Sequence, residues 1–398
     1  MDRFGDKVCC NPAVKLKKQK SYPIIDIDKI TPGYKTVRSV ESVEYTGQGG
    51  AKFQDHDVLF ARITPCLENG KMAIADTEGQ NGIGSTELFV FRGIDGVSDT
   101  DYVYYLLCMK HIRQLAANSM TGASGRQRAD LDFIKRIQWN FPDIETQKKI
   151  SSVLSAYDNL IEVNNKRIKT LEQMAENLYK EWFVRFRFPG HETAEFENGI
   201  PKGWGYNRIG DIATIKSGFA FKSDWWIEEG IPAIKIKDIV ENTVDLTDLS
   251  RVSQEHADNA KQFYVSAGDL LIALTGATIG KIALVPFAEK MTVNQRVGKF
   301  FIPTPAWESV AFLYCFFLQN NVQEEIASIA GSNAAQPNIS PIDIENLKTY
   351  YQEDVVKQFN DTLSPLILYM LTLRKANDNL IHQRDFLLPR LMIGKLEV

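Results

Sequence analysis

The residues best suited to bind a ligand lie in a glycine-rich segment, Gly122-Ala123-Ser124-Gly125-Arg126-Gln127-Arg128. Arginine and glutamine side chains form bidentate hydrogen bonds with the edges of guanine and adenine, and arginine also binds phosphate. Glycine allows a loop to approach its ligand closely. The segment therefore predicts a DNA-reading loop with Arg126, Gln127 and Arg128 as its contacts. The alternative interpretation is a solvated connection between two elements.

A second segment of the same kind runs from Gly331 to Asn338 and contains amide side chains but no cation. Two loops with different side chains suit two domains that read different sequences. Its predicted contacts are Asn333, Gln336 and Asn338.

Other candidate contacts are basic or polar side chains outside these two loops. A lysine run near the N-terminus has the charge to bind phosphate, although such a run is also typical of a solvated surface. Two lysines in the second half stand among Phe219, Phe221, Trp225 and Trp226, and these aromatic residues are more typical of a core than of base stacking. The candidates are Lys15, Lys17, Lys18 and Lys20, then Lys216 and Lys222, and more weakly Thr275, Thr278, Lys281, Asn294 and Arg296.

No catalytic or metal-binding motif accompanies these residues. The segment from Gly276 to Ile282 is one residue too short for a phosphate-binding loop and lacks the Ser or Thr after its lysine, so we interpret it as a hairpin. The five histidines form no metal-binding pair. His56, between Asp55 and Asp57, is interpreted as part of a solvated loop.

Composition indicates a globular protein of two to three domains, because the chain has 398 residues and is 44% hydrophobic. Five cysteines without zinc-site spacing, and no apolar run long enough to span a bilayer, predict a reduced, cytoplasmic protein without a structural metal or a membrane partner. The net charge of −4 argues against a strongly basic nucleic-acid binder. A DNA-binding face would need focused cations or phosphate contacts from partners.

The most informative feature is an internal repeat at an offset of about 209 residues. Asp57-Val58-Leu59-Phe60-Ala61 matches Asp269-Leu270-Leu271-Ile272-Ala273, and Gly70-Lys71-Met72-Ala73-Ile74 matches Gly280-Lys281-Ile282-Ala283-Leu284. Solenoid repeats are far shorter, at 20–50 residues. The offset therefore indicates a duplicated pair of domains.

Each half of the repeat predicts an α+β domain that combines short strands with an amphipathic stretch. In the first half the strands are 58–63, 71–75 and 87–92, and the amphipathic stretch is 102–118. In the second half they are 270–275, 281–285 and 297–302, with an amphipathic stretch at 310–330.

A long helix with heptad spacing closes each half. The first seam runs from Ile150 to Trp182, and adding 209 gives a second seam from Phe359 to Leu391. We expect the two helices to form an antiparallel coiled coil with each other, and the alternative is that each packs on its own domain. Pro365 is predicted to start or kink the second helix, and Pro389 to break its last turn.

Two asparagines, Asn164 and Asn377, occupy seam positions. Paired asparagines can fix the register of a coiled coil at a cost in stability. The equal alternative is that each faces a gap or solvent.

The arrangement as a whole resembles the specificity subunits of Type I restriction-modification systems. The resemblance covers essentially the whole chain and rests on the duplicated domain and helix together with several short motifs. These motifs are Asn177–Phe183 at the end of the first helix, Ile200–Trp204, Ile209–Ile212 and Lys216–Phe219 at the start of the second domain, and Leu387–Gly394 near the C-terminus.

The resemblance implies a division of labour among subunits. It implies two target-recognition domains, residues 1–142 and 191–351, each reading one half of a bipartite double-stranded DNA target. The central helix, 143–190, and the C-terminal helix, 352–398, hold the domains apart. They dock two methyltransferase subunits, which bind S-adenosylmethionine and methylate adenine. A motor-nuclease subunit joins them where the system cleaves DNA.

The chain itself is expected to hold no cofactor and to catalyse nothing. An adenine methyltransferase should carry an Asn/Asp-Pro-Pro-aromatic motif, and the nearest match, Asn11-Pro12-Ala13-Val14, lacks the second proline and the aromatic residue. Three alternatives stay open: the specificity subunit of a related assembly, such as a Type IIB enzyme or a phage-exclusion system; a self-contained nuclease or methyltransferase; and a coiled-coil scaffold without a DNA role.

Overall fold

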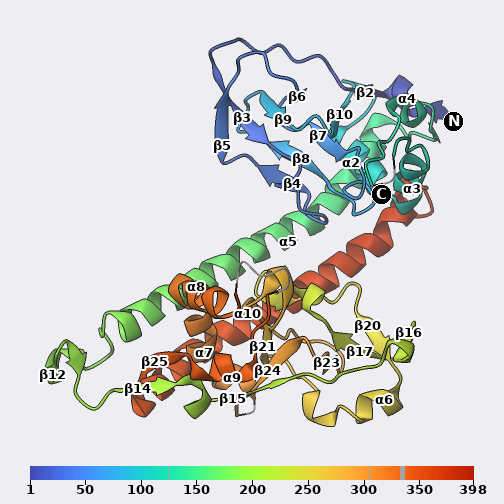
Figure 1. The fold of residues 1–398 in the computed structure, drawn as a ribbon. Helices are drawn as coiled ribbons and strands as arrows, with labels where there is room; N and C mark the ends of the chain where they lie inside the picture. Colours follow the sequence, from blue (N-terminus) through green and yellow to red (C-terminus); the bar gives the residue numbers. More distant parts are fainter. Residues whose placement is uncertain (124, 304, 332–336) are drawn as a thin grey trace. The chain divides into compact units, whose positions relative to one another are not determined.

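The computed structural model describes residues 1–123, 125–303, 305–331 and 337–398 (Figure 1). The chain forms two compact units. The first unit combines Met1–Val163 with Asp378–Val398, and the second unit is Asn164–Asn377. Each unit therefore contains one half of the sequence repeat and a part of both long helices.

The first unit is built on a five-stranded sheet in the order β2-β10-β7-β8-β4, in which only β4 pairs in parallel with its neighbour. All four residues of the central strand β7 are buried, which explains its uninterrupted apolar sequence. A second sheet has the order β5-β3-β9-β6. The strands are β2 Val8–Cys10, β3 Ser21–Ile25, β4 Thr36–Arg38, β5 Glu41–Glu44, β6 Ala51–Phe53, β7 Val58–Ala61, β8 Met72–Asp76, β9 Gly82–Gly84 and β10 Leu88–Gly93.

Short helices cover this sheet and close its core. Tyr102 and Tyr105 of α2 are almost completely buried and belong to the same core as Phe60 and Phe91 of the sheet. A short ladder joins the first residues to the end of the domain, with Arg3 opposite Gln138. The elements are β1 Asp2–Arg3, α1 Phe4–Lys7, α2 Thr100–Cys108, α3 Lys110–Asn118, α4 Leu131–Lys135 and β11 Gln138–Trp139.

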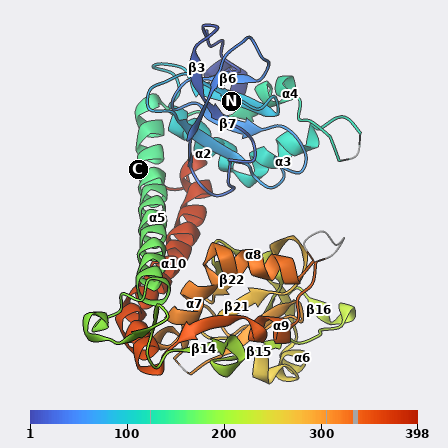
Figure 2. The ribbon, with the colours of Figure 1, turned by 60° about the vertical axis from the view of Figure 1, so that its left-hand side comes forward.

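The second unit repeats this plan with a sheet in the order β15-β24-β21-β22-β19-β18 and a second sheet in the order β16-β20-β17-β23. Figure 2 shows α7 and α8 beside the strands β21 and β22. The strands are β12 Phe196–Glu197, β13 Ile200–Pro201, β14 Gly205–Arg208, β15 Thr214–Ser217, β16 Trp226–Ile227, β17 Ile231–Ile234, β18 Ile239–Val240, β19 Thr243–Val244, β20 Ser250–Val252, β21 Leu270–Ala273, β22 Ile282–Leu284, β23 Thr292–Val293, β24 Val297–Phe301 and β25 Lys348–Tyr351, and the helices are α6 Gln254–Asp258, α7 Ala311–Phe317, α8 Asn320–Ile329 and α9 Pro341–Asn346.

The strand order confirms the predicted duplication, because β10-β7-β8 in the first unit corresponds to β24-β21-β22 in the second. The segment interpreted as a hairpin does connect an antiparallel pair, with Leu271 opposite Ala283. Each of the two predicted amphipathic stretches consists of two helices. Met109 ends α2 and Gln319 precedes α8 with extended backbone, so the chain turns between the helices of each pair.

Each long helix extends through both units. The first, α5, is Ile144–Tyr179 and continues into a π-helical turn, Lys180–Val184, and the second, α10, is Glu353–Met392. The prediction that Pro365 starts α10 is wrong, and Pro389 does not break it, because both prolines lie inside the helix. A proline inside a helix costs about 3 kcal/mol. Buried side chains on either side of Pro365, such as Leu363 and Ile367, offset this cost by anchoring the helix to the core.

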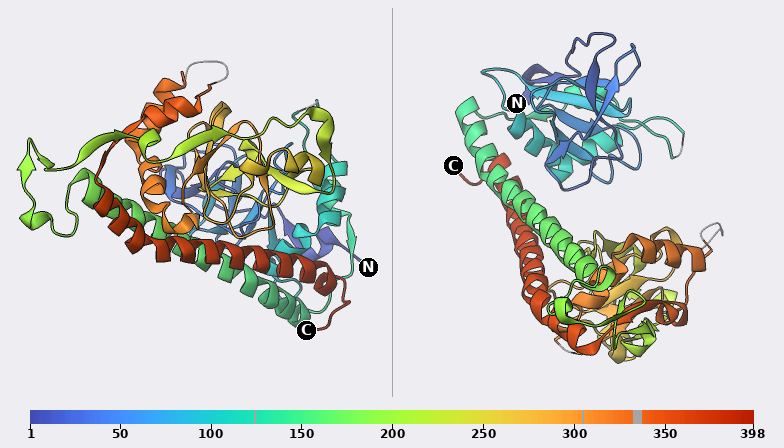
Figure 3. Two further views of the ribbon diagram at one scale, coloured as in Figure 1. Left: turned by 90° about the horizontal axis from the view of Figure 1, so that it is seen from below. Right: turned by 90° about the vertical axis from the view of Figure 1, so that its left-hand side faces the viewer.

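Within each unit the two helices pair antiparallel, as expected from their seams (Figure 3). In the second unit the guanidinium of Arg374 lies 2.9 Å from the carboxylate of Glu172, and in the π-helical turn that follows α5 the ring of Trp182 packs on Phe359 at 5.4 Å between centroids. In the first unit Arg384 lies 2.5 Å from Asp158. Residue numbers thus fall along α10 as they rise along α5.

The two seam asparagines contact each other. Asn164 Nδ2 donates to Asn377 Oδ1 at 2.9 Å, and Asn377 Nδ2 donates to Asn165 Oδ1 at 2.8 Å. Asn164 and Asn377 are both buried. The first of the two interpretations, a paired asparagine within the coiled coil, is therefore confirmed, and the pairing specifies which residues face one another.

Asn377→Leu is expected to destabilise the second unit by about 1–3 kcal/mol, because it leaves the buried amide of Asn164 without its partner. Asn164→Leu combined with Asn377→Leu is expected to restore most of the loss, since apolar residues then face each other. Denaturant unfolding followed by circular dichroism measures both effects. Asn177→Leu, on the exposed surface of α5, is the control. An Asn377→Leu variant as stable as this control would show that the pair contributes nothing.

Candidate nucleic-acid interface

The predicted reading loop is anchored to the sheet by its last residues. Arg128 forms backbone bridges with Ile63 and Thr121, and Gln127 accepts a hydrogen bond from the backbone nitrogen of Thr64 at 3.0 Å. These contacts fix the end of the loop beside strand β7, while Ser124 lies outside the described residues.

The two arginines of this loop have different surroundings. The Arg128 guanidinium binds both carboxylate oxygens of Glu87, with Nη2 at 2.6 Å from Oε1 and Nε at 2.9 Å from Oε2. These hydrogen bonds lower the pKa of Glu87 and occupy the planar edge of the guanidinium that would otherwise read a base. Arg126 is exposed and forms no side-chain hydrogen bond or ion pair with the described residues. Of the two, Arg126 is the one available to DNA.

A third arginine, which the sequence interpretation missed, lies between these elements. Arg62 directly follows β7 and its guanidinium carbon is 4.8 Å from the ring centroid of Phe89. Its Nε atom is buried and has no hydrogen-bond partner among the described residues. Two hollows of about 480 and 430 Å³ adjoin it, and both are lined by Arg62 and Asn11.

A set of backbone hydrogen bonds holds Arg62 in place. We call this set the reading frame of the first unit, meaning a backbone framework that positions side chains to read DNA and not a codon frame. The Arg62 nitrogen donates to the Glu87 oxygen at 2.9 Å, and the Arg62 oxygen accepts from the Ala129 nitrogen at 2.8 Å. The Thr64 nitrogen donates to the Gln127 oxygen at 3.0 Å. The frame thus joins the end of β7, the start of β10 and the end of the loop.

The second unit contains the same frame with different side chains. Leu274 donates to the Arg296 oxygen at 3.0 Å and accepts from the Ile339 nitrogen at 3.0 Å. Gly276 donates to the Pro337 oxygen at 3.0 Å. Leu274 therefore stands where the first unit has Arg62, and Arg296 where it has Glu87.

The surroundings of this position differ as well. The strand registers place Gly298 of the second unit where the first has Phe89. A Cβ atom at Gly298 would lie 2.9 Å from Cγ2 of Ile272 and 3.4 Å from Cδ2 of Leu274, so neighbouring side chains already occupy the space that a ring would need. One backbone arrangement thus presents a stacked arginine in one unit and a packed leucine in the other.

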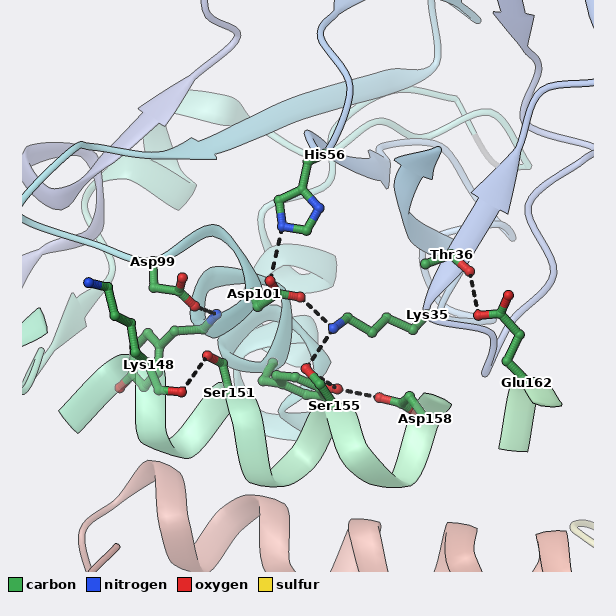
Figure 4. A network of polar contacts seen from close by, with 12 residues as sticks. Lys35, Thr36, His56, Asp99, Asp101, Lys148, Ser151, Ser155, Asp158 and Glu162 are labelled. Carbon is green, nitrogen blue, oxygen red and sulfur yellow. Dashed lines mark hydrogen bonds and ion pairs between the residues drawn. The ribbon is translucent and has the colours of Figure 1, made fainter. Parts of the chain in front are cut away.

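A polar network connects the first domain to α5 (Figure 4). Lys35 forms an ion pair with Asp101 and donates to the hydroxyl of Ser155 on α5 at 2.7 Å. His56 Nε2 lies 2.9 Å from Asp101, and this hydrogen bond raises the pKa of His56. Burial disfavours the charged form of Asp101, but the contacts with His56 and Lys35 outweigh it and lower its pKa to about 2.

These contacts give the network a structural role, which is to fix the domain on its helix. His56 remains largely exposed, in agreement with a solvated loop, although it has a carboxylate partner. In the part of the chain that the structure describes, no group of His, Cys, Asp or Glu side chains could hold a metal ion.

A family model named Type I restriction modification DNA specificity domain matches residues 10–173 and again residues 201–375. The chain belongs to this family. The two matches coincide with the two copies of the repeat, so each unit carries one specificity domain.

Two curated relatives are specificity subunits, and the chain matches them along most of their length. The chain is 28% identical over 321 residues to the MjaIX specificity subunit of Methanocaldococcus jannaschii, covering 77% of this chain and 72% of that protein. It is 24% identical over 429 residues to the HindI specificity subunit of Haemophilus influenzae, covering 88% of each. The crystal structure of an S subunit from M. genitalium shares the fold, with a TM-score of 0.51 and 17% identity over 98% of this chain and 95% of that one.

The protein is therefore a Type I specificity subunit, which recognises a bipartite DNA target together with the other subunits of its system and catalyses no reaction itself. The alternatives of a self-contained enzyme and of a scaffold are thereby set aside. Within the described residues, no helix combines the length and the apolar composition that crossing a bilayer requires.

The remaining predicted contacts of the first unit lie on one exposed segment of the specificity subunit. Lys15, Lys17, Lys18 and Lys20 are all exposed between β2 and β3. Lys20 stands 5.5 Å from the ring of Tyr22. Their position leaves them free to contact phosphate.

The predicted contacts of the second unit are more scattered. Lys216 is exposed on β15, and Lys222 lies over the ring of Trp225 at 5.2 Å. The aromatic residues beside them are core, as expected: Phe221 is buried, and Phe219, Trp225 and Trp226 pack against the same cluster.

Several polar candidates surround the frame of the second unit. Thr275 bridges to Asn338, and its buried hydroxyl has no partner among the described residues. Lys281 and Arg296 are exposed, and Thr278 and Asn294 are half-buried. Asn333 and Gln336 lie outside the described residues.

Proposed function

We propose that the first unit reads one half of the bipartite target and the second unit reads the other half, each through its own reading frame. The observation that carries this assignment is the shared backbone of the two frames with different side chains at equivalent positions, Arg62 against Leu274 and Glu87 against Arg296. A common backbone suits a common way of docking on DNA, and side chains that differ at base-contacting positions read different sequences.

We also propose that the subunit assembles with two methyltransferase subunits, one for each copy of the repeat. S-adenosylmethionine then belongs to the methyltransferases, while the chain holds no cofactor, and a motor-nuclease subunit joins the complex for restriction. The assembly works in the cytoplasm, where the DNA is.

Equivalent exposed apolar residues on the two long helices support two docking surfaces. Leu160 on α5 is 53% exposed, and Tyr369 on α10, at the same position 209 residues later, is 45% exposed. A large apolar side chain left exposed at both repeat positions is typical of a surface that a partner covers.

The expected stoichiometry is two methyltransferases per specificity subunit. Leu160→Lys and Tyr369→Lys should each remove one copy, and the double variant both, because a charge cannot be buried in an apolar contact without a partner. Light scattering of the co-purified complex measures the ratio, with the exposed Lys169→Glu on α5 as control. A one-to-one complex of the unmodified subunit at excess methyltransferase would contradict the proposal.

A further inference from the structure

We infer that Arg62 is the base-reading residue of the first unit and that it selects guanine in the half-site of that unit. The inference rests on the proposed assignment of one half-site to each unit. It adds which base the first reading frame contacts and through which side chain. It assigns no equivalent arginine to the second unit.

The first support is the free hydrogen-bonding capacity of Arg62. Its guanidinium forms no hydrogen bond or ion pair with the described residues, and its Nε is buried. Leaving a buried charged donor without a partner costs more than a typical hydrogen bond is worth. Glu87 lies nearby, but Arg128 occupies both of its carboxylate oxygens. The donors of Arg62 are therefore kept available for an acceptor from outside the chain.

The second support is the orientation of the side chain. The ring of Phe89, which is itself buried, lies 4.8 Å from the guanidinium carbon and holds the planar group against the end of β7. A guanidinium held in this way loses little conformational freedom on binding. Its rigid fork matches the O6 and N7 acceptors of guanine, which is the commonest specific contact in the major groove.

The surrounding residues favour a base contact over a phosphate contact. The two hollows beside Arg62 share Asn11, and polar residues such as Thr86 and Thr121 line their walls. Arg126 and the lysines of residues 15–20 are exposed instead. Exposed cations can follow the phosphate backbone, whereas Arg62 lies in the recess that a base edge would have to enter.

The third support is the contrast with the second unit. Leu274 occupies the equivalent position and has no donor, and Thr275 and Asn338 adjoin it. Apolar groups contact the methyl group of thymine and asparagine pairs with adenine. The second half-site is therefore expected to lack a guanine contact at this place.

The test is methylome sequencing of the assembled enzyme with Arg62→Met, Arg62→Lys and Arg62→Gln. Methionine keeps an apolar stem over Phe89, so the fold should persist, and melting curves check this for each variant. We expect one guanine position in one half-site to become degenerate while the other half-site is unchanged. Binding of the cognate duplex should weaken about tenfold to a hundredfold.

Two other variants complete the experiment. Arg126→Ala should weaken all sequences evenly if it contacts phosphate, and Arg38→Ala removes an exposed, ion-paired arginine of the same unit and should change nothing. An even loss for the Arg62 variants, or an unchanged half-site, would overturn the inference. If replacement of residues 201–351 still altered a single half-site, the proposed assignment of the units would stand; if it altered both, that assignment would itself fail.

Discussion

Replacement of residues 201–351 by the corresponding domain of another Type I specificity subunit is expected to exchange one half of the methylated DNA sequence and to leave the other half as it was. The reason is that the second reading frame, from Leu274 to Ile339, lies wholly inside the replaced segment. No residue of the first frame is changed.

The structure also indicates that residues 201 and 351 are suitable boundaries for this replacement. The first complete strand of the segment, β14, pairs with its last strand, β25, with Gly205 opposite Tyr351, so the graft brings its own closing ladder. Phe312 inside the segment packs on Tyr179 and Phe183 of the retained chain, at 5.7 and 4.8 Å between ring centroids. The donor domain should therefore carry an aromatic residue at the Phe312 position.

Methylome sequencing of the chimera measures the outcome, and a second chimera with residues 1–142 replaced is the matched control. The two chimeras should alter opposite half-sites. A chimera that folds, methylates DNA and changes both half-sites would show that the halves are not read independently.

Asp158→Ala is expected to destabilise the first unit by about 3–5 kcal/mol, the usual cost of removing one partner from a buried ion pair. The side chains of Asp158 and Arg384 are 5% and 14% exposed, and Nη1 of Arg384 lies 2.5 Å from the carboxylate. The hydroxyl of Tyr105 donates to the other carboxylate oxygen. The substitution removes the buried acceptor that Arg384 and Tyr105 share, and Arg384 is left with its contact to the exposed Asp385 at 2.8 Å.

Denaturant unfolding of the specificity subunit measures this loss. Asp132→Ala is the control, because that aspartate pairs with Lys135 at the surface, where solvent screens the pair, and its loss should change the stability little. Asp158→Leu combined with Arg384→Met should recover much of the stability, since apolar residues of similar volume avoid the cost of desolvating two charges. An Asp158→Ala variant no less stable than the control would mean that the ion pair is not a significant link between α5 and α10.

Much of the architecture could be predicted because it follows from local patterns in the sequence. The repeat is visible as matching strings at a nearly constant offset, and the strands as short apolar runs such as Val58–Ala61. Heptad spacing places Asn164 and Asn377 at seam positions. Each of these signals depends on residues that are close together in the chain, or on a comparison of one half with the other.

The candidate site could not be predicted in the same way. It depends on which residues far apart in the chain lie close together in space, and no local sequence pattern shows this. Arg62, Glu87 and Arg128 are separated by tens of residues, and only the pairing of β7 with β10 and with the end of the loop brings them together. That pairing decides that Arg128 is occupied by a carboxylate and that Arg62, an unremarkable cation after a strand in the sequence, has free donors.

The same distinction applies to the helices. Local rules place a start or a break at Pro365 and Pro389, yet burial of the surrounding seam keeps α10 continuous past both. The sequence by itself determined a duplicated α+β domain with two heptad helices, because these follow from periodicity. Only the tertiary structure decided which seam residues meet and which arginine is free, because both depend on the competition of distant side chains for the same partners.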